Sequence, residues 1–301
     1  MRVVDLFAGC GGLSLGFQKA GYEIVAAFEW WDSAVACYKE NFTHPILQVD
    51  LSNVSGAIGE VQKYNPDIII GGPPCQDFSH AGKRIENERA ELTQCYANIV
   101  VGIRPVAFVM ENVDRAQSSH AYAEARKIFK ANGYGLTEIV LDASRCGTPQ
   151  KRKRFICFGM LNKPDGFALD AFTKRLSPKA MTLRDYFGDT LGFEYYYRHP
   201  RNYSRRAIFS IDEPAPTMRG VNRPVPKGYP GHKNDPCPVT EDLHALTTQE
   251  RALIQTFPED FKWIGNKTDL EQMIGNAVPV NLAQFVGDVI KEFVEEDQHH
   301  D

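Results

Sequence analysis

The sequence predicts an α/β fold in which a mostly parallel sheet carries helices on both faces, joined to a smaller, irregular β-rich domain. Short apolar runs alternate with helix-like stretches over residues 1–160, which is the pattern of a parallel α/β sheet. Runs such as Asp67–Ile70 are apolar after their first residue, as suits strands covered on both faces. Residues 195–238 are instead rich in Pro, Gly, Tyr and Arg without helical periodicity, which indicates short strands and ordered loops.

Each strand and helix of the larger domain is placed from its apolar pattern. The expected strands are Val3–Phe7, Ile24–Phe28, Ile46–Val49, Asp67–Ile70, Val106–Met110, Glu138–Leu141 and Phe155–Met160. The expected helices between them are Leu13–Lys19, Ser33–Asn41, Ser55–Tyr64, Leu92–Ile103 and Ala121–Ala131. Helical pattern returns at Thr247–Thr256 and Leu282–Glu296, and we expect the last helix to pack back on the larger domain. The predicted boundaries are residues 1–180 and 266–301 for the larger domain and 181–265 for the smaller one.

The composition is that of an ordinary globular protein, with 43% hydrophobic and 24% charged residues among 301. No run of about 18 apolar residues predicts a membrane span, and the strand-like Arg2–Phe7 directly after Met1 leaves no room for a targeting peptide. Seven scattered cysteines without a Cys-x-x-Cys pair argue against a disulfide framework and a cysteine zinc site, so we expect no metal. Free thiols of this kind are typical of the reducing cytoplasm, which is the location we expect.

Charge is distributed unevenly along the chain. The formal net charge of −4 argues weakly against a nucleic-acid partner, yet the segment 198–233 carries eight Lys or Arg residues against only Asp212 and Glu213. A second basic group, Lys151–Arg154, lies upstream. One such cluster is usually a solvated face, but two clusters that flank the same segment favour a phosphate-binding surface.

A glycine-rich turn, within Asp5–Gly12, follows the first predicted strand. Its Gly-x-Gly-Gly spacing differs from the Gly-x-Gly-x-x-Gly of dinucleotide-binding proteins, and on its own it is also compatible with a plain tight turn. Glu29 ends the second strand, where an acidic side chain can hold a ribose diol, and Trp30 could stack on adenine or pack in the core. Asp50 ends the third strand, placed to meet an adenine amino group. Together these strand-end features favour S-adenosylmethionine as the cofactor.

Two further strand ends carry reactive side chains. The run Gly71–Gln76 reads Gly-Gly-Pro-Pro-Cys-Gln, in which two prolines restrict the backbone just before Cys75. Most cysteines are small buried hydrophobes, but one presented rigidly at the ligand-binding edge of a sheet is a candidate nucleophile. Glu111 directly follows the apolar fifth strand, where a carboxyl group is costly to bury without an acid or hydrogen-bonding role.

The chain resembles the DNA (cytosine-5) methyltransferases over nearly its whole length. The resemblance rests on motifs that occur in the family's order: Asp5–Gly12, Glu29-Trp30, Gly71–Ser79, Glu111–Val113, Gln150–Arg154, Pro214–Thr217 and Gly275–Pro279. It implies the Rossmann-like fold of S-adenosylmethionine-dependent methyltransferases, with the smaller domain recognising the target. The implied reaction transfers a methyl group from S-adenosylmethionine to carbon 5 of cytosine and leaves S-adenosylhomocysteine. Because that carbon cannot be reached in a stacked duplex, the base must be flipped out.

The resemblance also implies a role for each matching residue. Cys75 would attack cytosine C6, Glu111 would hold N3, and Asn112 would support the loop around Cys75. Arg152 and Arg154 would bind the base and polarise the site. The residues implied to surround the cofactor are Phe7, Gly9, Gly11, Gly12, Glu29, Trp30, Asp50, Pro74, Leu92, Asn276 and Val278. Residues 76–91 match the loop that closes over DNA in this family, and Asp77 departs from it by placing a charge where a small residue is usual.

Double-stranded DNA is the implied partner, bound by a monomer. The family's target-recognition segment lies mostly between the Gln150–Arg154 and Pro214–Thr217 motifs, which here leaves the short stretch Phe155–Glu213, assisted by the basic Arg219–Lys233. So small a domain would read about four to six base pairs in the major groove. The residues expected to contact DNA are Gln76, Ser79, Arg205, Arg206, Thr217, Arg219 and Arg223. A cognate restriction endonuclease could act on the same site without direct contact.

Three alternatives stay open on the sequence. A transfer-RNA cytosine-5 methyltransferase would share the motifs and the chemistry, although the arginine-rich segment favours duplex DNA. A non-catalytic DNA-binding regulator would keep the fold, but the intact Pro74-Cys75, Glu111 and Arg152 argue against it. A nicotinamide oxidoreductase ranks last because the glycine spacing differs from its fingerprint.

Overall fold

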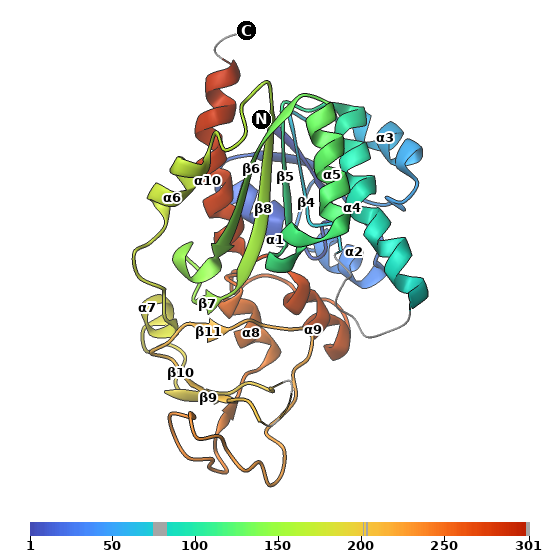
Figure 1. Cartoon of the computed structure of the whole chain (residues 1–301). Coiled ribbons are helices and arrows are strands. Elements are labelled where there is room, and N and C mark those ends of the chain that lie inside the picture. Colours follow the sequence, from blue (N-terminus) through green and yellow to red (C-terminus); the bar gives the residue numbers. More distant parts are fainter. Residues whose placement is uncertain (75–82, 201, 203, 299–301) are drawn as a thin grey trace.

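The computed structural model describes residues 1–74, 83–200, 202 and 204–298, and for residues 83–91 and 297–298 it gives only the course of the helix. The chain forms an α/β unit, in the upper part of Figure 1, and a smaller unit of short strands and loops below it. Several sequence predictions fall on residues that lie outside the described ones: Cys75, Gln76, Asp77 and Ser79.

A seven-stranded sheet forms the centre of the larger unit, with the strand order β3-β2-β1-β4-β5-β8-β6. All pairs from β3 to β5 are parallel, whereas β8 runs antiparallel to both of its neighbours, β5 and β6. The strands are β1 Arg2–Leu6, β2 Glu23–Glu29, β3 Ile46–Gln48, β4 Ile68–Gly71, β5 Ala107–Val113, β6 Tyr134–Asp142 and β8 Lys153–Leu161. The seven predicted strands are therefore present, in the mostly parallel sheet that we expected.

Helices cover both faces of this sheet (Figure 1). The face under α3, α4 and α5 buries Val61, Val100 and Phe129, and the face under α1, α6 and α10 buries Phe17 and Val286. The helices are α1 Gly12–Lys19, α2 Asp32–Lys39, α3 Val54–Gln62, α4 Lys83–Ile103, α5 His120–Ala131, α6 Leu169–Arg175 and α10 Val280–Gln298, with the 3-10 turns η1 Asp114–Ser118 and η2 Ala143–Arg145. Within the described ranges, no helix has both the length and the apolar character needed to span a membrane.

The smaller unit is built on a three-stranded sheet of order β10-β9-β12. Its apolar core joins Leu183, Tyr196, Ile211 and Leu246. Its elements are α7 Leu183–Phe187, β9 Tyr195–Tyr197, β10 Ile208–Ser210 and β12 His244–Ala245. Two further short strands, β7 Gln150–Lys151 and β11 Ala215–Pro216, pair in parallel and so connect the smaller unit to the start of β8.

The segment 248–265, which we assigned to the smaller domain, contacts both units. Helix α8 Thr248–Ile254 contributes Ile254 to the core of the smaller unit. The turn after it places Phe257 and Phe261 in a core shared with α2 and with α9 Lys267–Asn276. An amphipathic pattern identifies a helix but does not reveal which core the helix joins, so the boundary at residue 265 stays a prediction.

Candidate active site

A large cavity lies at the edge of the sheet where β1, β2, β4 and β5 end. Its walls come from the turn after β1, the ends of β2, β4 and β5, the start of β8, the segment 217–220 and the end of α9. Its volume of ≈ 1290 Å³ exceeds the range of about 300–1,000 Å³ that holds one small ligand. The cavity therefore has room for two reactants side by side.

The turn after β1 forms part of the cavity wall. Phe7 lines the cavity with a φ of 58°, a left-handed conformation that costs a bulky residue about 1–2 kcal/mol. Gly11 faces away, because a Cβ at this position would overlap the ring of Phe42. A Cβ on Gly12 would overlap the backbone oxygen of Val278, so the glycine lets the turn touch the chain that follows α9.

Glu29 ties this turn to the end of β2. Its Oε2 accepts a hydrogen bond from the backbone N–H of Gly9 at 2.8 Å, and its Oε1 accepts from those of Trp30 at 2.8 Å and Trp31 at 2.9 Å. A carboxylate offers about four acceptor positions, so about one is left for a ligand hydroxyl. The Trp30 side chain is 65% exposed, and it is Trp31, which we did not single out, that lines the cavity.

The other predicted cofactor residues divide into two groups. Pro74, Asn276 and Val278 line the cavity. Asp50 is exposed, and its Oδ1 accepts hydrogen bonds from the backbone and hydroxyl of Ser52 at 2.9 and 2.7 Å. Leu92 is half-buried on α4 and does not reach the cavity.

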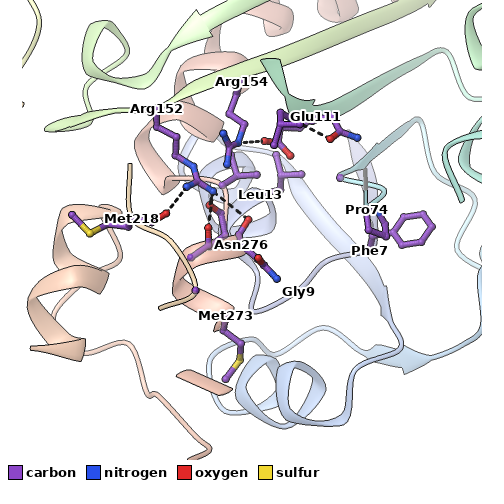
Figure 2. A pocket seen from close by; sticks show the side chains of 18 of the residues that line it. Phe7, Gly9, Leu13, Pro74, Glu111, Arg152, Arg154, Met218, Met273 and Asn276 are labelled. Atoms are coloured by element: carbon purple, nitrogen blue, oxygen red, sulfur yellow. Dashed lines mark hydrogen bonds and ion pairs between the residues drawn. The ribbon is translucent and has the colours of Figure 1, made fainter. Parts of the chain in front are cut away.

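Glu111 and Arg154 form an ion pair in the cavity wall, with 2.8 Å between Oε1 and Nε (Figure 2). The contact follows from the strand register: Arg154 lies opposite Val113 in the antiparallel β5–β8 pair, hence diagonal to Glu111 on the same face. Burial raises the pKa of the Glu111 carboxyl above its ordinary value, and the positive charge of Arg154 opposes that rise. A carboxyl group with a raised pKa can hold a proton and donate a hydrogen bond to a buried ligand.

Asn112 and Gly72 set the path of the chain that leads to residue 75. Asn112 Nδ2 donates a hydrogen bond to the backbone oxygen of Pro73 at 2.8 Å. A Cβ on Gly72 would lie 3.0 Å from Glu111 Oε2, so the backbone passes close to this carboxylate. The chain therefore runs beside Glu111 just before the residues that the structure does not describe.

Arg152 lies deeper than Arg154 and faces backbone atoms. It is 1% exposed, and it donates from Nη1 to the oxygen of Met218 at 3.0 Å and from Nη2 to the oxygens of Gly275 and Ala277, both at 2.9 Å (Figure 2). We expected Arg152 and Arg154 to act together on the base, and both line the cavity. Arg152 also joins the segment 217–220 to the end of α9, and its role on the base stays a prediction.

A buried ion pair also holds the segment 217–222 against α9. Arg251 of α8 pairs with Glu271 of α9, and both side chains are almost wholly buried. Arg251 donates to the backbone oxygen of Arg219, and Asn222 donates to Glu271 at 3.2 Å. The segment is therefore fixed from both sides by charged groups that the sequence analysis did not anticipate.

The DNA-contacting residues that we predicted within the described ranges do not lie together. Thr217 and Arg219 line the cavity, and Arg205 and Arg223 are exposed outside its wall. Arg206 is held by an ion pair inside the smaller unit. The cavity lining also includes residues that we did not predict, among them Asp114, Met218, Gln272 and Met273.

Fold and site together define an α/β enzyme that brings two reactants to one edge of its sheet. No group of three or more His, Cys, Asp or Glu residues could hold a metal ion in the part of the chain that the structure describes. The chemistry available at the cavity is that of a buried carboxyl group and two guanidinium groups.

Comparison with known proteins identifies the kind of enzyme. The model of the C-5 cytosine-specific DNA methylase family matches residues 1–292. The type II methyltransferase M.HindV of Haemophilus influenzae is 57% identical over 298 residues, 98% of each chain, and M.HgiDI of Herpetosiphon aurantiacus is 51% identical over 295 residues, 98% of this chain and 95% of that one. The crystal structure of S. pombe Dnmt2 methyltransferase shares the fold, with a TM-score of 0.74 at 19% identity over 97% of this chain and 99% of that one. The chain belongs to the C-5 cytosine-specific DNA methylase family and is a DNA (cytosine-5) methyltransferase.

Proposed function

We propose that this protein methylates a cytosine flipped out of double-stranded DNA, with S-adenosylmethionine as methyl donor and Cys75 as covalent nucleophile. The observation that carries the proposal is the Glu111–Arg154 pair, buried in a wall of the large cavity beside the backbone that leads to residue 75. The names of the similar type II methyltransferases favour a sequence-specific enzyme of a restriction-modification system. A cognate endonuclease would act on the same site without touching this chain, which we propose to be a cytoplasmic monomer.

S-adenosylmethionine fits the wall made by the turn after β1, the end of β2 and the end of α9. A Cβ on Gly9 would meet no atom within 4 Å, so the turn leaves open space where a ligand can approach the backbone. Glu29 keeps an acceptor position for a ribose hydroxyl, and the exposed ring of Trp30 is available to stack on adenine. When bound, the cofactor supplies an electrophilic methyl group.

The opposite wall would activate the base, because cytosine C5 is a poor nucleophile. The Cys75 thiolate forms a bond to C6, and the electron pair of the C5–C6 double bond moves toward C5 and N3. Glu111 donates its proton to N3, which a carboxyl group of raised pKa is suited to do, and Arg154 keeps the carboxyl in place. C5 would then take the methyl group, whose bond to the sulfonium sulfur breaks to leave S-adenosylhomocysteine. The C5 proton leaves to a base, the thiolate is expelled as the C5–C6 double bond re-forms, and N3 returns its proton to Glu111.

Base flipping follows from the geometry of the reaction. Neither C5 nor C6 of a stacked cytosine is accessible to a cavity whose reactive wall is buried. The volume of ≈ 1290 Å³ accommodates an extruded base beside the cofactor. Thr217 and Arg219 at the cavity, with Arg223 outside it, would face the DNA that surrounds the flipped nucleotide.

The test is transfer of a tritiated methyl group from S-adenosylmethionine to duplex DNA and, separately, to transfer RNA. We expect label in DNA alone, and bisulfite sequencing of a treated plasmid should place 5-methylcytosine at one short repeated sequence. A Cys75→Ala variant serves as the control that keeps the cofactor wall intact. Label in transfer RNA without label in DNA would show that the protein is a transfer-RNA methyltransferase instead. Label in neither would contradict the proposal.

A further inference from the structure

A second cavity, of ≈ 500 Å³, lies beside the first along α9. It is bordered by Asn222, Arg223, Pro224, Ala245–Thr248, Lys267 and Leu270. The segment 217–224 and the helix α9 each contribute residues to both cavities. Around α9 these residues lie on different sides, since Lys267 and Gln272 are about 140° apart, so the segment 217–224 is what leads from one cavity to the other.

The second cavity is positively charged. Arg223 and Lys267 are both exposed, and no carboxylate is among the residues that border the cavity. The two nearest acids on α9 are already engaged, since Glu271 pairs with Arg251 and Asp269 accepts a hydrogen bond from Ser33 at 2.7 Å. Two cations that face open space, with the nearest carboxylates already engaged, attract an anion of the phosphate type.

We propose that this second cavity binds a phosphate of the DNA backbone close to the flipped cytosine, with Lys267 and Arg223 as its cationic contacts. The inference rests on the proposed function. Arg223 lies three residues after Gly220, a residue of the first cavity, so at most about 11 Å of chain separates them. One strand of B-DNA carries a phosphate about every 3.4 Å of axis, so the second cavity lies within about three phosphates of the first.

A phosphate bound at the second cavity would help to position the DNA strand. Asn222 is fixed to the buried Glu271, and the next residue, Arg223, borders the second cavity. A phosphate held there would set the register of the strand relative to the first cavity, because the same short segment forms a wall of both. Phosphate contacts position DNA in this way without reading its sequence.

The first experiment measures how DNA affinity depends on salt for Lys267→Gln, Arg223→Gln and the double variant. The probe is a duplex that carries the site mapped by bisulfite sequencing, and Lys174→Gln on α6 is the matched control, since Lys174 is also exposed but lies on another helix of the larger unit. Each lost phosphate contact should reduce the salt slope by about 0.9 and weaken binding about fivefold at 0.15 M salt. The kcat of the Lys174→Gln control at saturating DNA, and the thermal unfolding of all variants, should match those of the unmodified protein.

The second experiment locates the phosphate. Uncharged methylphosphonates replace single phosphates within about three nucleotides of the target cytosine. One or two positions should weaken binding to the unmodified protein and to the Lys174→Gln control, but not to the double variant. Unchanged salt slopes, or equal methylphosphonate penalties in the double variant and the unmodified protein, would overturn the inference while methyl transfer to DNA persists. Failure of the unmodified protein to methylate any DNA would overturn the proposed function and, with it, this inference.

Discussion

The guanidinium of Arg152 lies 3.0 Å from the backbone oxygen of Met218 and 2.9 Å from that of Gly275, so one side chain joins the segment 217–220 to the end of α9. Arg154, two residues further along, instead pairs with Glu111 in the cavity wall. The two arginines of a single motif thus have different partners. One holds backbone together and the other holds a carboxyl group that faces the reactants.

This difference predicts opposite results for two conservative substitutions. Lysine cannot reproduce the fork that serves several carbonyls, so Arg152→Lys should lower the free energy of unfolding by about 2–4 kcal/mol. Arg154→Lys should change stability less but reduce kcat by about a hundredfold or more, because the carboxyl loses its fixed partner. Urea unfolding and single-turnover methyl transfer measure the two effects. Equal losses of stability in both variants would show that Arg152 and Arg154 do not have these separate roles.

Glu111→Gln tests the acid assignment. The amide keeps the shape of the side chain but cannot give up a proton to N3, so kcat should fall by about 10²–10⁴-fold. Cofactor affinity, measured by calorimetry, should stay within about threefold because Glu111 faces the base and not the cofactor wall. Turnover within tenfold of the unmodified enzyme would remove Glu111 from the chemical step.

Asp5 predicts a pH dependence of folding stability. Its carboxyl is fully buried, with Oδ2 accepting a hydrogen bond from the Ser14 hydroxyl at 2.6 Å, and burial raises its pKa from 3.8 to about 7. The folded chain therefore keeps a proton that the unfolded chain releases, and stability should fall by up to about 4 kcal/mol as pH rises from about 4 to about 7.

Urea unfolding of Asp5→Asn at pH 5 and pH 7.5 checks this expectation. The variant should show a much smaller fall between the two values than the unmodified protein, whereas Asp50→Asn, at an exposed carboxylate, should keep the full fall. The same pH dependence in the Asp5→Asn variant would assign it to other groups.

The buried Arg251–Glu271 pair predicts strong non-additivity. Removing one partner leaves a buried charge, so Glu271→Ala should cost about 3–5 kcal/mol of stability. Replacing both partners by apolar residues, Arg251→Met with Glu271→Leu, should cost less than the single change. If thermal and urea unfolding gave simply additive losses, the pair would not act as a buried ion pair.

The sequence predicted the strands and helices of the larger unit well because apolar periodicity controls burial there. It did not reveal that β8 runs antiparallel, since the pattern of a strand carries no direction, and that direction is what brings Arg154 diagonal to Glu111. The helices α6 and α9 were not predicted; α9 contains only three apolar residues, Leu270, Met273 and Ile274, too few to establish a helical period. That Trp31 lines the cavity and Trp30 does not depends on the geometry of the turn after β2, which the sequence of two adjacent tryptophans does not reveal.

The most direct test of the account uses DNA whose target cytosine carries fluorine at C5. Cys75 should still add to C6 and the methyl group should still transfer, but fluorine cannot leave as a positive ion, so the thiol cannot be expelled. The account predicts a protein–DNA adduct that survives denaturation, requires both S-adenosylmethionine and the recognition site, and maps to Cys75 rather than Cys10. A duplex that is methylated normally when unsubstituted, yet gives no stable adduct when fluorinated, would contradict the covalent mechanism.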